Sequence, residues 1–163
     1  MINSSYIIRE IEARDNKQIK NIIQSVILEM GAPKIGTAYE DISLEDMFTA
    51  YQKDNAIYFV VEHDGKVLGG GGIAQLDDVK KNTCELQKMY FMPQIRGKGL
   101  GAKMIEKCIL KAKEFGYNQC YLETMPYMTA ARKLYAKNGF SQIDSPMGNT
   151  CHYSCDVWMI RTL

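Results

Sequence analysis

The sequence lacks an excess of charge of either sign. Its 20 lysines and arginines are matched by 19 aspartates and glutamates, and the formal net charge is +1 at pH 7. Proteins that bind nucleic acids usually carry a basic face and a strongly basic balance. We therefore expect no nucleic acid partner.

Long apolar runs and a secretory signal are also lacking. No run approaches the roughly 20 apolar residues that a membrane helix needs, and the first residues do not have the pattern of a cleavable signal. We therefore expect a cytoplasmic protein with no membrane partner. The cysteines are odd in number and irregularly spaced, which is typical of reduced thiols: Cys84, Cys108, Cys120, Cys151 and Cys155.

Histidine is scarce, with two residues in the chain, and this bears on metal binding and thiol chemistry. Cys151-His152-x-x-Cys155 puts two thiols near an imidazole, as an acyl-enzyme mechanism would need. If the segment is extended, however, the two cysteines share one face and His152 points the other way. A zinc site usually has four ligands, and His63 is the one further histidine. We expect buried structural cysteines and no metal.

Length and composition favour one domain. The 163 residues, 46% of them hydrophobic and 24% charged, suffice for a sizeable core. No internal repeat or low-complexity segment divides the chain, so we expect a single domain over residues 1–163. Hydrophobic periodicity predicts strands at 6–11, 56–62, 67–75, 83–91, 119–124 and 153–160, with a return to the sheet after 140, and helices at 15–31, 43–51, 99–115 and 126–139.

Three local patterns add detail to this order. Asp15, with Gln18 following in the first turn, predicts a capped helix start. The run from Gly69 to Gly72 is unusual inside a strand and predicts a bulge or the close approach of another backbone. The polar segment 77–82 predicts a hairpin loop.

A glycine-rich turn stands between an apolar strand and a helix. Gly97, Gly99 and Gly101 leave backbone N–H groups without side chains in the way. The first amides of a helix have no intrahelical partner, and the helix dipole favours negative charge there. Arg96 and Lys98 add positive charge. The turn therefore predicts a phosphate or pyrophosphate site.

Two motifs for phosphate ligands overlap at this turn. Gly97-x-Gly99-x-x-Ala102 satisfies the dinucleotide fingerprint, with Glu123 placed where a ribose-binding acid would lie. The fingerprint normally follows its strand directly, whereas residues 93–96 intervene here, and too little chain follows Glu123 for a doubly wound sheet. A P-loop is excluded because the sequence has no Gly-Lys-Ser/Thr at the required spacing.

The spacing Gln94-x-x-Gly97-x-Gly99, after a proline and with an Arg96-Gly97 pair, resembles the acyl-CoA pyrophosphate loop of the GNAT superfamily of N-acyltransferases. Glu85-Leu86 upstream and the segment 131–140, Ala-Arg-Lys-Leu-Tyr-Ala-Lys-Asn-Gly-Phe, extend the resemblance over about residues 58–140. It implies an α+β fold, an α/β/α sandwich. A mixed, mostly antiparallel central sheet is flanked by helices, and its central strands, 83–91 and 119–124, splay apart.

The resemblance also implies a ligand and the residues that bind it. Acetyl-CoA would be the acyl donor, with its pyrophosphate on the glycine turn and its pantetheine arm paired with the strand backbone. Backbone amides there would stabilise negative charge on the thioester oxygen. The implied acetyl-CoA-binding residues are Met89, Phe91, Gln94, Arg96, Gly97, Lys98, Gly99, Leu100, Gly101 and Ala102.

Direct transfer to an amine needs a base for the amine proton and an acid for the leaving thiolate. Tyr135 matches the tyrosine of the family that commonly protonates the sulfur. Glu85 lies where several members carry a base, acting directly or through water, and Glu123 is a second carboxylate candidate. Met128 replaces an asparagine that many relatives carry, which removes one expected pantetheine contact.

The implied activity is transfer of acetyl to a primary amine of a small molecule or an amino acid. Glu40, Asp41, Asp77 and Asp78 are acidic residues that could attract a cationic amine. The alternatives are a protein or peptide N-acetyltransferase, acting on an N-terminus or a lysine, and a non-catalytic acyl-CoA-binding sensor. Homodimers are frequent in the family. The segments 31–41 and 145–152 would face the acceptor and match no subgroup.

Overall fold

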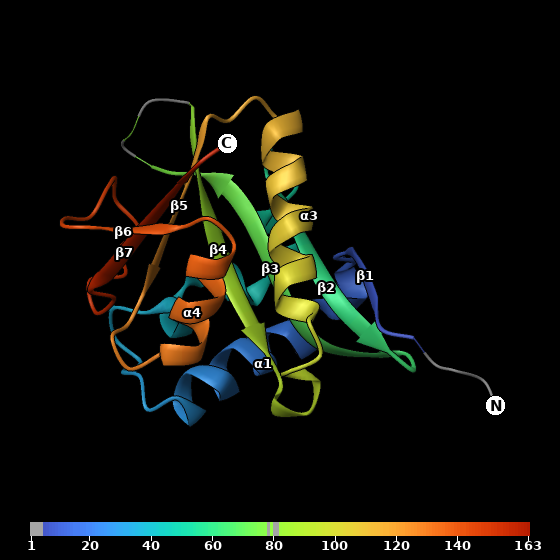
Figure 1. Cartoon of the computed structure of the whole chain (residues 1–163). Helices are drawn as coiled ribbons and strands as arrows, with labels where there is room; N and C mark the ends of the chain where they lie inside the picture. The colour runs from blue at the N-terminus through green and yellow to red at the C-terminus, as the bar shows by residue number, and fades with distance from the viewer. Residues whose placement is uncertain (1–4, 78, 80–81) are drawn as a thin grey trace.

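The computed structural model describes residues 5–77, 79 and 82–163. These residues form a central sheet of seven strands in the order β1-β2-β3-β4-β5-β7-β6. Figure 1 shows how the sheet and the helices are arranged. Neighbouring strands are antiparallel except β4 and β5, which are parallel. The mixed, mostly antiparallel sheet expected from the sequence is confirmed. The strands are β1 (Ile7–Glu10), β2 (Ile57–His63), β3 (Lys66–Gln75), β4 (Thr83–Phe91), β5 (Gln119–Thr124), β6 (Ser141–Ile143) and β7 (Val157–Thr162).

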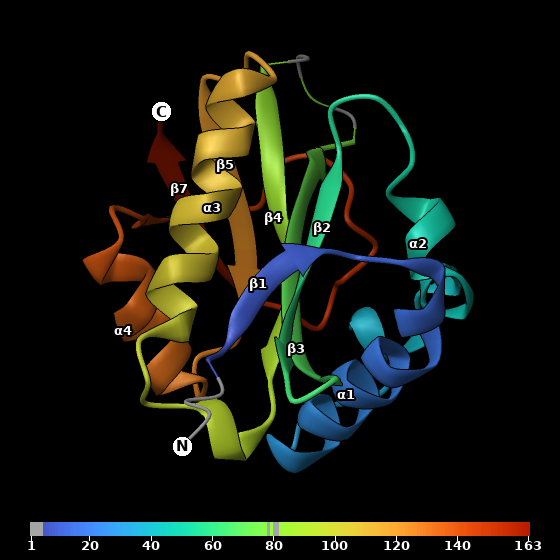
Figure 2. The same cartoon turned by 90° about the vertical axis from the view of Figure 1, so that its right-hand side faces the viewer.

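Helices cover both faces of the sheet. The helix α3 lies on one face with α4, and α1 lies on the other face near α2 (Figure 2). Apolar residues at helical spacing form the buried side of each long helix, and they belong to two separate core clusters. The helices are α1 (Asn16–Glu29), α2 (Met47–Ala50), α3 (Leu100–Glu114) and α4 (Thr129–Lys137).

The glycine run in β3 makes room for a tyrosine ring. A Cβ atom on Gly72 would stand 2.5 Å from the carbonyl oxygen of Ile57 and 2.6 Å from the Tyr58 ring, and one on Gly70 would also meet that ring. The Tyr58 hydroxyl then donates a 2.7 Å hydrogen bond to the carbonyl oxygen of Lys88 in β4. The sequence predicted a bulge or the close approach of another backbone, and the β3–β4 pairing has a bulge between Gly70 and Gly72. The space over the glycines is filled by the Tyr58 side chain, which crosses β3 to reach the next strand.

Replacing Gly72 with alanine should destabilise the protein by about 1–3 kcal/mol, because the new methyl group would overlap backbone atoms that cannot move aside easily. Urea unfolding would measure this loss. Gly71→Ala is the matched control, since a Cβ there meets only flexible methionine side chains, the closest atom being Met104 Cγ at 3.1 Å. Equal losses for the two variants would contradict the steric explanation.

A β-bulge divides β4 into two parts. Gly72 pairs with Gln87 and Gly70 pairs with Tyr90, so Lys88 and Met89 together face a single residue of β3. Lys88 has a positive φ of 49°, which is uncommon for a residue other than glycine. The extra residue shifts the alternation of β4. As a result, Met89 packs against the core cluster that includes Met104 of α3, and Tyr90 packs against the core cluster that includes Ile19 of α1.

The strands β4 and β5 pair only where both begin. Their register runs from Thr83 opposite Gln119 to Glu85 opposite Tyr121 and stops there. Figure 1 shows the two strands diverging beyond this point, with α4 beside the separation. The expected splay of the central strands is therefore present, and it leaves the later part of β4 without a strand on that side.

Several local predictions were wrong. The Asp15 side chain makes no capping bond to α1; it accepts hydrogen bonds from the Glu12 amide and the Arg9 guanidinium. The second helix is one turn long and is capped by Asp46, after a separate 3₁₀ turn at Ile42–Glu45. The last strand begins at Val157 because a turn precedes it. Part of the expected 77–82 loop lies outside the described residues.

Candidate active site

The glycine turn lies between a short 3₁₀ turn (Pro93–Ile95) and α3. Gly97 and Gly99 have positive φ angles of 73° and 76°, and no atom lies within 4 Å of the place where either Cβ would stand. Within the described chain, no hydrogen bond uses the backbone N–H groups of residues 97–102. A run of free amides at the start of a fifteen-residue helix is suited to bind a phosphate group.

The two cationic side chains at the turn already have partners. Arg96 donates to both carboxylate oxygens of Glu29 in α1, at 2.7 and 3.0 Å, and to the carbonyl oxygen of Phe91 at 2.9 Å. Lys98 Nζ lies 6.0 Å from the centre of the Tyr6 ring. These contacts tie the turn to α1 and to the end of β4. The role of both cations toward a bound ligand stays a prediction.

The helices α3 and α4 pack closely beside the splayed strands. A Cβ on Gly101 would stand 2.6 Å from Leu134 Cδ2, so the third glycine of the turn serves helix packing. Tyr135, the next residue of α4, is 8% exposed and packs edge-on against Phe140, with 6.1 Å between the ring centres. Burial raises the pKa of Tyr135 to about 12, so the phenol keeps its proton at neutral pH and can donate it.

Glu85 lies where β4 and β5 stop pairing. Its side chain is on the face opposite α3 and accepts a 2.5 Å hydrogen bond from Gln87 Nε2. The residue is 6% exposed, and burial raises the pKa of Glu85 to about 7. A carboxylate with a pKa near the working pH is well matched to accept a proton from an amine.

Three charged side chains form a chain of contacts on the same face. Asp41 accepts a hydrogen bond from Lys88 Nζ at 2.9 Å through one oxygen, and its other oxygen lies 2.8 Å from His152 Nε2. Burial by itself raises the pKa of Asp41, but the two cations outweigh it and lower the pKa below its usual range. Burial also lowers the pKa of His152, and the bond to Asp41 outweighs that effect and raises it.

Glu123 in β5 is the second carboxylate near this group. The Thr150 hydroxyl donates a hydrogen bond to it. Burial raises the pKa of Glu123, and Thr150 opposes that shift. Glu123 in turn raises the pKa of Glu85, whereas His152 and Lys88 lower it, so these side chains lie within electrostatic range of one another.

The segments 31–41 and 145–155 meet beside these charges. The Ser154 amide donates to the carbonyl oxygen of Gly36, and the Ser154 hydroxyl donates to that of Ile35. The sequence predicted that residues 31–41 and 145–152 face the acceptor. The contact of Asp41 with His152 joins these two segments, and their facing an acceptor stays a prediction. Sequence reasoning missed the link that Asp41 makes between Lys88 and His152, because loop residues 111 positions apart have no periodic pattern to relate them.

The cysteines near His152 do not form a thiolate site. Residues 151–154 form a turn rather than an extended segment, and His152 is directed to Asp41. Burial raises the pKa of the Cys155 thiol to about 12, so it stays protonated at neutral pH. Cys151 is exposed and Cys155 is half-buried, so the expectation of buried structural cysteines is wrong for Cys151 and met only in part by Cys155.

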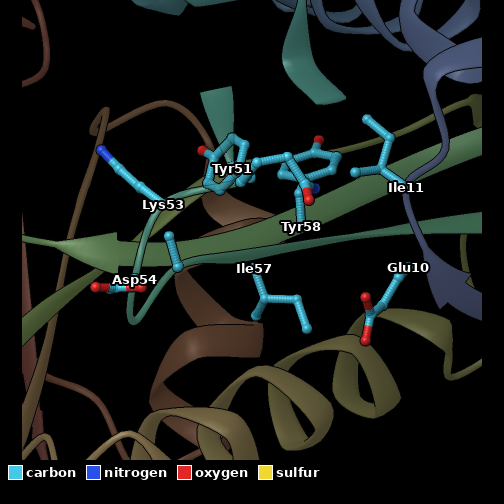
Figure 3. Close-up of a pocket in the computed structure, with 9 residues that line it drawn as sticks. Glu10, Ile11, Tyr51, Lys53, Asp54, Ile57 and Tyr58 are labelled. Carbon is cyan, nitrogen blue, oxygen red and sulfur yellow. The ribbon is translucent and has the colours of Figure 1, made fainter. Parts of the chain in front are cut away.

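Other possible sites carry less chemistry. A pocket of about 220 Å³ is lined by residues that include Glu10, Tyr51, Lys53 and Tyr58, none of them a predicted site residue. Figure 3 shows these side chains. Over residues 5–77, 79 and 82–163, no group of histidine, cysteine, aspartate and glutamate side chains is arranged to hold a metal ion. In the same part of the chain, no helix is long and apolar enough to cross a membrane.

Comparisons with known proteins show the family and the fold. The uncharacterized N-acetyltransferase YjgM of Escherichia coli K12 is 42% identical over 161 residues, covering 98% of this chain and 96% of that protein. The fold is similar to a GNAT-family acetyltransferase of Staphylococcus aureus Mu50, with a TM-score of 0.86, 23% identity and coverage of 97% and 99% of the two chains.

A third relative was solved with a ligand. The structure of yncA of Salmonella typhimurium with its cofactor acetyl-CoA has a TM-score of 0.77 and 21% identity, with 98% of this chain and 94% of that chain covered. The model of the acetyltransferase (GNAT) family matches residues 25–140, which include β2 to β5, the glycine turn and α4. The chain therefore belongs to the GNAT acetyltransferase family and is an acyltransferase.

Proposed function

We propose that this protein transfers acetyl from acetyl-CoA to a primary amine of a small molecule or an amino acid, by direct attack of the amine. The observation that carries the proposal is that free amides, a candidate acid and a candidate base lie on elements that border one separation in the sheet. The free amides are at residues 97–102, Tyr135 is on α4, and Glu85 is on β4.

The residues at the splay fit acetyl-CoA. The free amides at residues 97–102 would hold its pyrophosphate, and the open positions at Gly97 and Gly99 leave room for it. Beyond Glu85, β4 has no strand partner on its β5 side, so backbone groups of Met89 and Phe91 are available to pair with the pantetheine arm as an added strand would. Acetyl-CoA would supply the acetyl group as an activated thioester.

Two proton movements accompany the transfer. The reaction forms one N–C bond and breaks one C–S bond. Glu85 in its ionised form takes the proton that the amine loses. Tyr135 gives its proton to the departing sulfur. Backbone N–H groups of β4 stabilise the negative charge that develops on the thioester oxygen. A sensor module would need neither proton-transfer group, which favours the enzyme.

Binding of CoA species tests the proposal first. Acetyl-CoA and CoA should each stabilise the protein in a thermal shift assay, whereas NAD should not. A ligand at 100 times its dissociation constant adds about 2.7 kcal/mol to the free energy of unfolding, which is a readily measured shift. Stabilisation by NAD alone would restore the dinucleotide interpretation of the glycine turn and remove this mechanism.

The acceptor is then found by an activity screen. Acetyl-CoA is incubated with a panel of small amines, amino acids and peptides, and thiol release is measured. Acetylation of peptide N-termini or lysines in preference to small amines would favour the protein-acetylating alternative. We further propose that residues 1–163 form one catalytic domain and that it acts in the cytoplasm.

A further inference from the structure

Two cations meet beside Glu85 although they come from distant parts of the chain. Lys88 is at the bulge of β4, and His152 is in the segment before β7. Asp41, from the segment after α1, lies 2.9 Å from Lys88 Nζ and 2.8 Å from His152 Nε2. The Lys88 side chain is 8% exposed. A lysine this deeply buried is rare in proteins unless it is paired.

The bulge is what directs Lys88 to this place. In a regular strand the Lys88 side chain would lie on the face opposite to that of Gln87, toward α3. The extra residue lets Lys88 contact Asp41 on the face that carries Glu85 and Gln87. The Tyr58 hydroxyl donates a 2.7 Å hydrogen bond to the Lys88 carbonyl oxygen. The position of the ammonium group is therefore set by backbone geometry and by a core side chain.

This group of charges has donors to spare. An ammonium group has three N–H donors and a protonated imidazole has two. Among the described residues, Asp41 is the one hydrogen-bonding partner of Lys88 Nζ, and it takes one ring nitrogen of His152. Asp41 thus contacts both side chains with a single carboxylate. The remaining N–H donors are suited to an anionic group of a ligand.

The two carboxylates near these cations, Glu85 and Glu123, offer hydrogen-bond acceptors instead of donors. Glu85 accepts one hydrogen bond, from Gln87, and Glu123 is held by Thr150. Both carboxylates lie within electrostatic range of His152. The site therefore presents negative groups and positive groups next to each other. Such a pattern complements a molecule that carries an amine and a carboxylate close together.

We propose that Lys88 and His152 bind a carboxylate of the acceptor, so that the acceptor is a free amino acid or a similar small amino-carboxylate. This inference rests on the proposed function and specifies its acceptor class. It opposes a protein substrate, because the carboxyl group next to a protein N-terminus is part of a peptide bond and carries no charge. Asp41 is a positioning residue that holds the two cations together.

Matched substrates test the inference on the unaltered protein. Free α-, β- and ω-amino acids are compared with their carboxamides and with the amines that lack the carboxyl group, with acetyl-CoA as donor. Replacing the carboxylate by a carboxamide should lower kcat/KM about 100-fold or more, since a site built to bind a polar group rejects analogues that lack it. The measurement is thiol release under initial-rate conditions.

A pair of lysine variants assigns the effect to a residue. Lys88→Met should bring the ratio of kcat/KM for acid and carboxamide close to 1. Lys113→Met removes an equal charge from the exposed side of α3 and should leave the ratio unchanged. The thermal shift with acetyl-CoA shows that each variant is folded. Should Lys88→Met not fold, the substrate comparison on the unaltered protein decides the question without it.

The possible outcomes distinguish a failure of the carboxylate site from a failure of the proposed acetyl transfer. Failure to bind acetyl-CoA would overturn the proposed function. If acetyl transfer occurs and carboxamides, simple amines or peptides react as well as the acids, the carboxylate site is overturned while the enzyme stands. The carboxylate site is also overturned if acetyl-CoA binds and no amino-carboxylate in the panel is acetylated.

Discussion

Glu85→Gln should lower kcat/KM for acetyl transfer about 100- to 10,000-fold, the range that general-base catalysis usually contributes. Glutamine keeps the size of the side chain and cannot accept the amine proton. Gln87 can still bond the amide oxygen, as it now bonds Oε1 at 2.5 Å. Steady-state kinetics would measure the loss, and unchanged stabilisation by acetyl-CoA would show that the donor site is intact.

The pH profile gives this prediction a sharper form. The base works in its ionised form, so kcat/KM should fall as the pH drops below the Glu85 pKa of about 7. His152 lowers that pKa and Glu123 raises it. The acidic limb should therefore move to higher pH in His152→Gln and to lower pH in Glu123→Gln. Opposite movements of one limb are not expected from a general loss of stability.

Glu85 has titratable neighbours, and the pH profile must distinguish their ionisation from that of Glu85. His152 is also titratable; burial lowers its pKa, and the contact with Asp41 outweighs burial and raises the pKa above its ordinary value. If the limb disappears in His152→Gln and persists in Glu85→Gln, His152 is the base and Glu85 is not. The other titratable side chains within electrostatic range of Glu85 are Lys88, Glu123, Tyr51, Cys120, Tyr121 and Cys155.

Tyr135→Phe should lower kcat about 100-fold or more and change acetyl-CoA affinity less than about twofold. The phenol is buried, and burial raises its pKa to about 12, so it is protonated at neutral pH, as the proposed acid must be. The ring contact with Phe140, 6.1 Å between centres, is retained by phenylalanine. Calorimetry would measure the affinity, and single-turnover kinetics would measure the chemical step.

Tyr117→Phe is the matched control for this variant. Its hydroxyl donates to the Asn55 carbonyl oxygen at 2.7 Å, beyond the end of α3 that is farthest from the glycine turn. We expect lower stability and an unchanged transfer rate. If Tyr135→Phe transfers acetyl at the rate of the unaltered protein, Tyr135 is not the acid and only its packing role is left.

The sequence was most informative where local rules determine structure. Apolar spacing predicted α1 and α3, and alternate glycines predicted the turn at Gly97 and Gly99, since positive φ angles and free helix-start amides are local properties. The first helix cap was mispredicted because Asp15 is held by Arg9, a strand residue. Local capping patterns do not include such partners.

The charged half of the site depends on contacts that no local pattern contains. Asp41 was expected only as one of several acidic residues, and His152 only as a neighbour of cysteines. Lys88 was not among the predicted site residues, because the bulge that turns its side chain away from the apolar face is created by pairing with β3. The strand alternation that predicts faces correctly elsewhere fails at a bulge, where one residue is added.

The four glycines of β3 limit how this protein can be stabilised. Valine or isoleucine at Gly70 or Gly72 would raise the strand propensity of β3. It would also displace the Tyr58 ring and with it the hydroxyl that holds the bulge carbonyl. Variants selected for heat resistance should therefore gain substitutions on helix surfaces and in loops, and keep this weak stretch of strand.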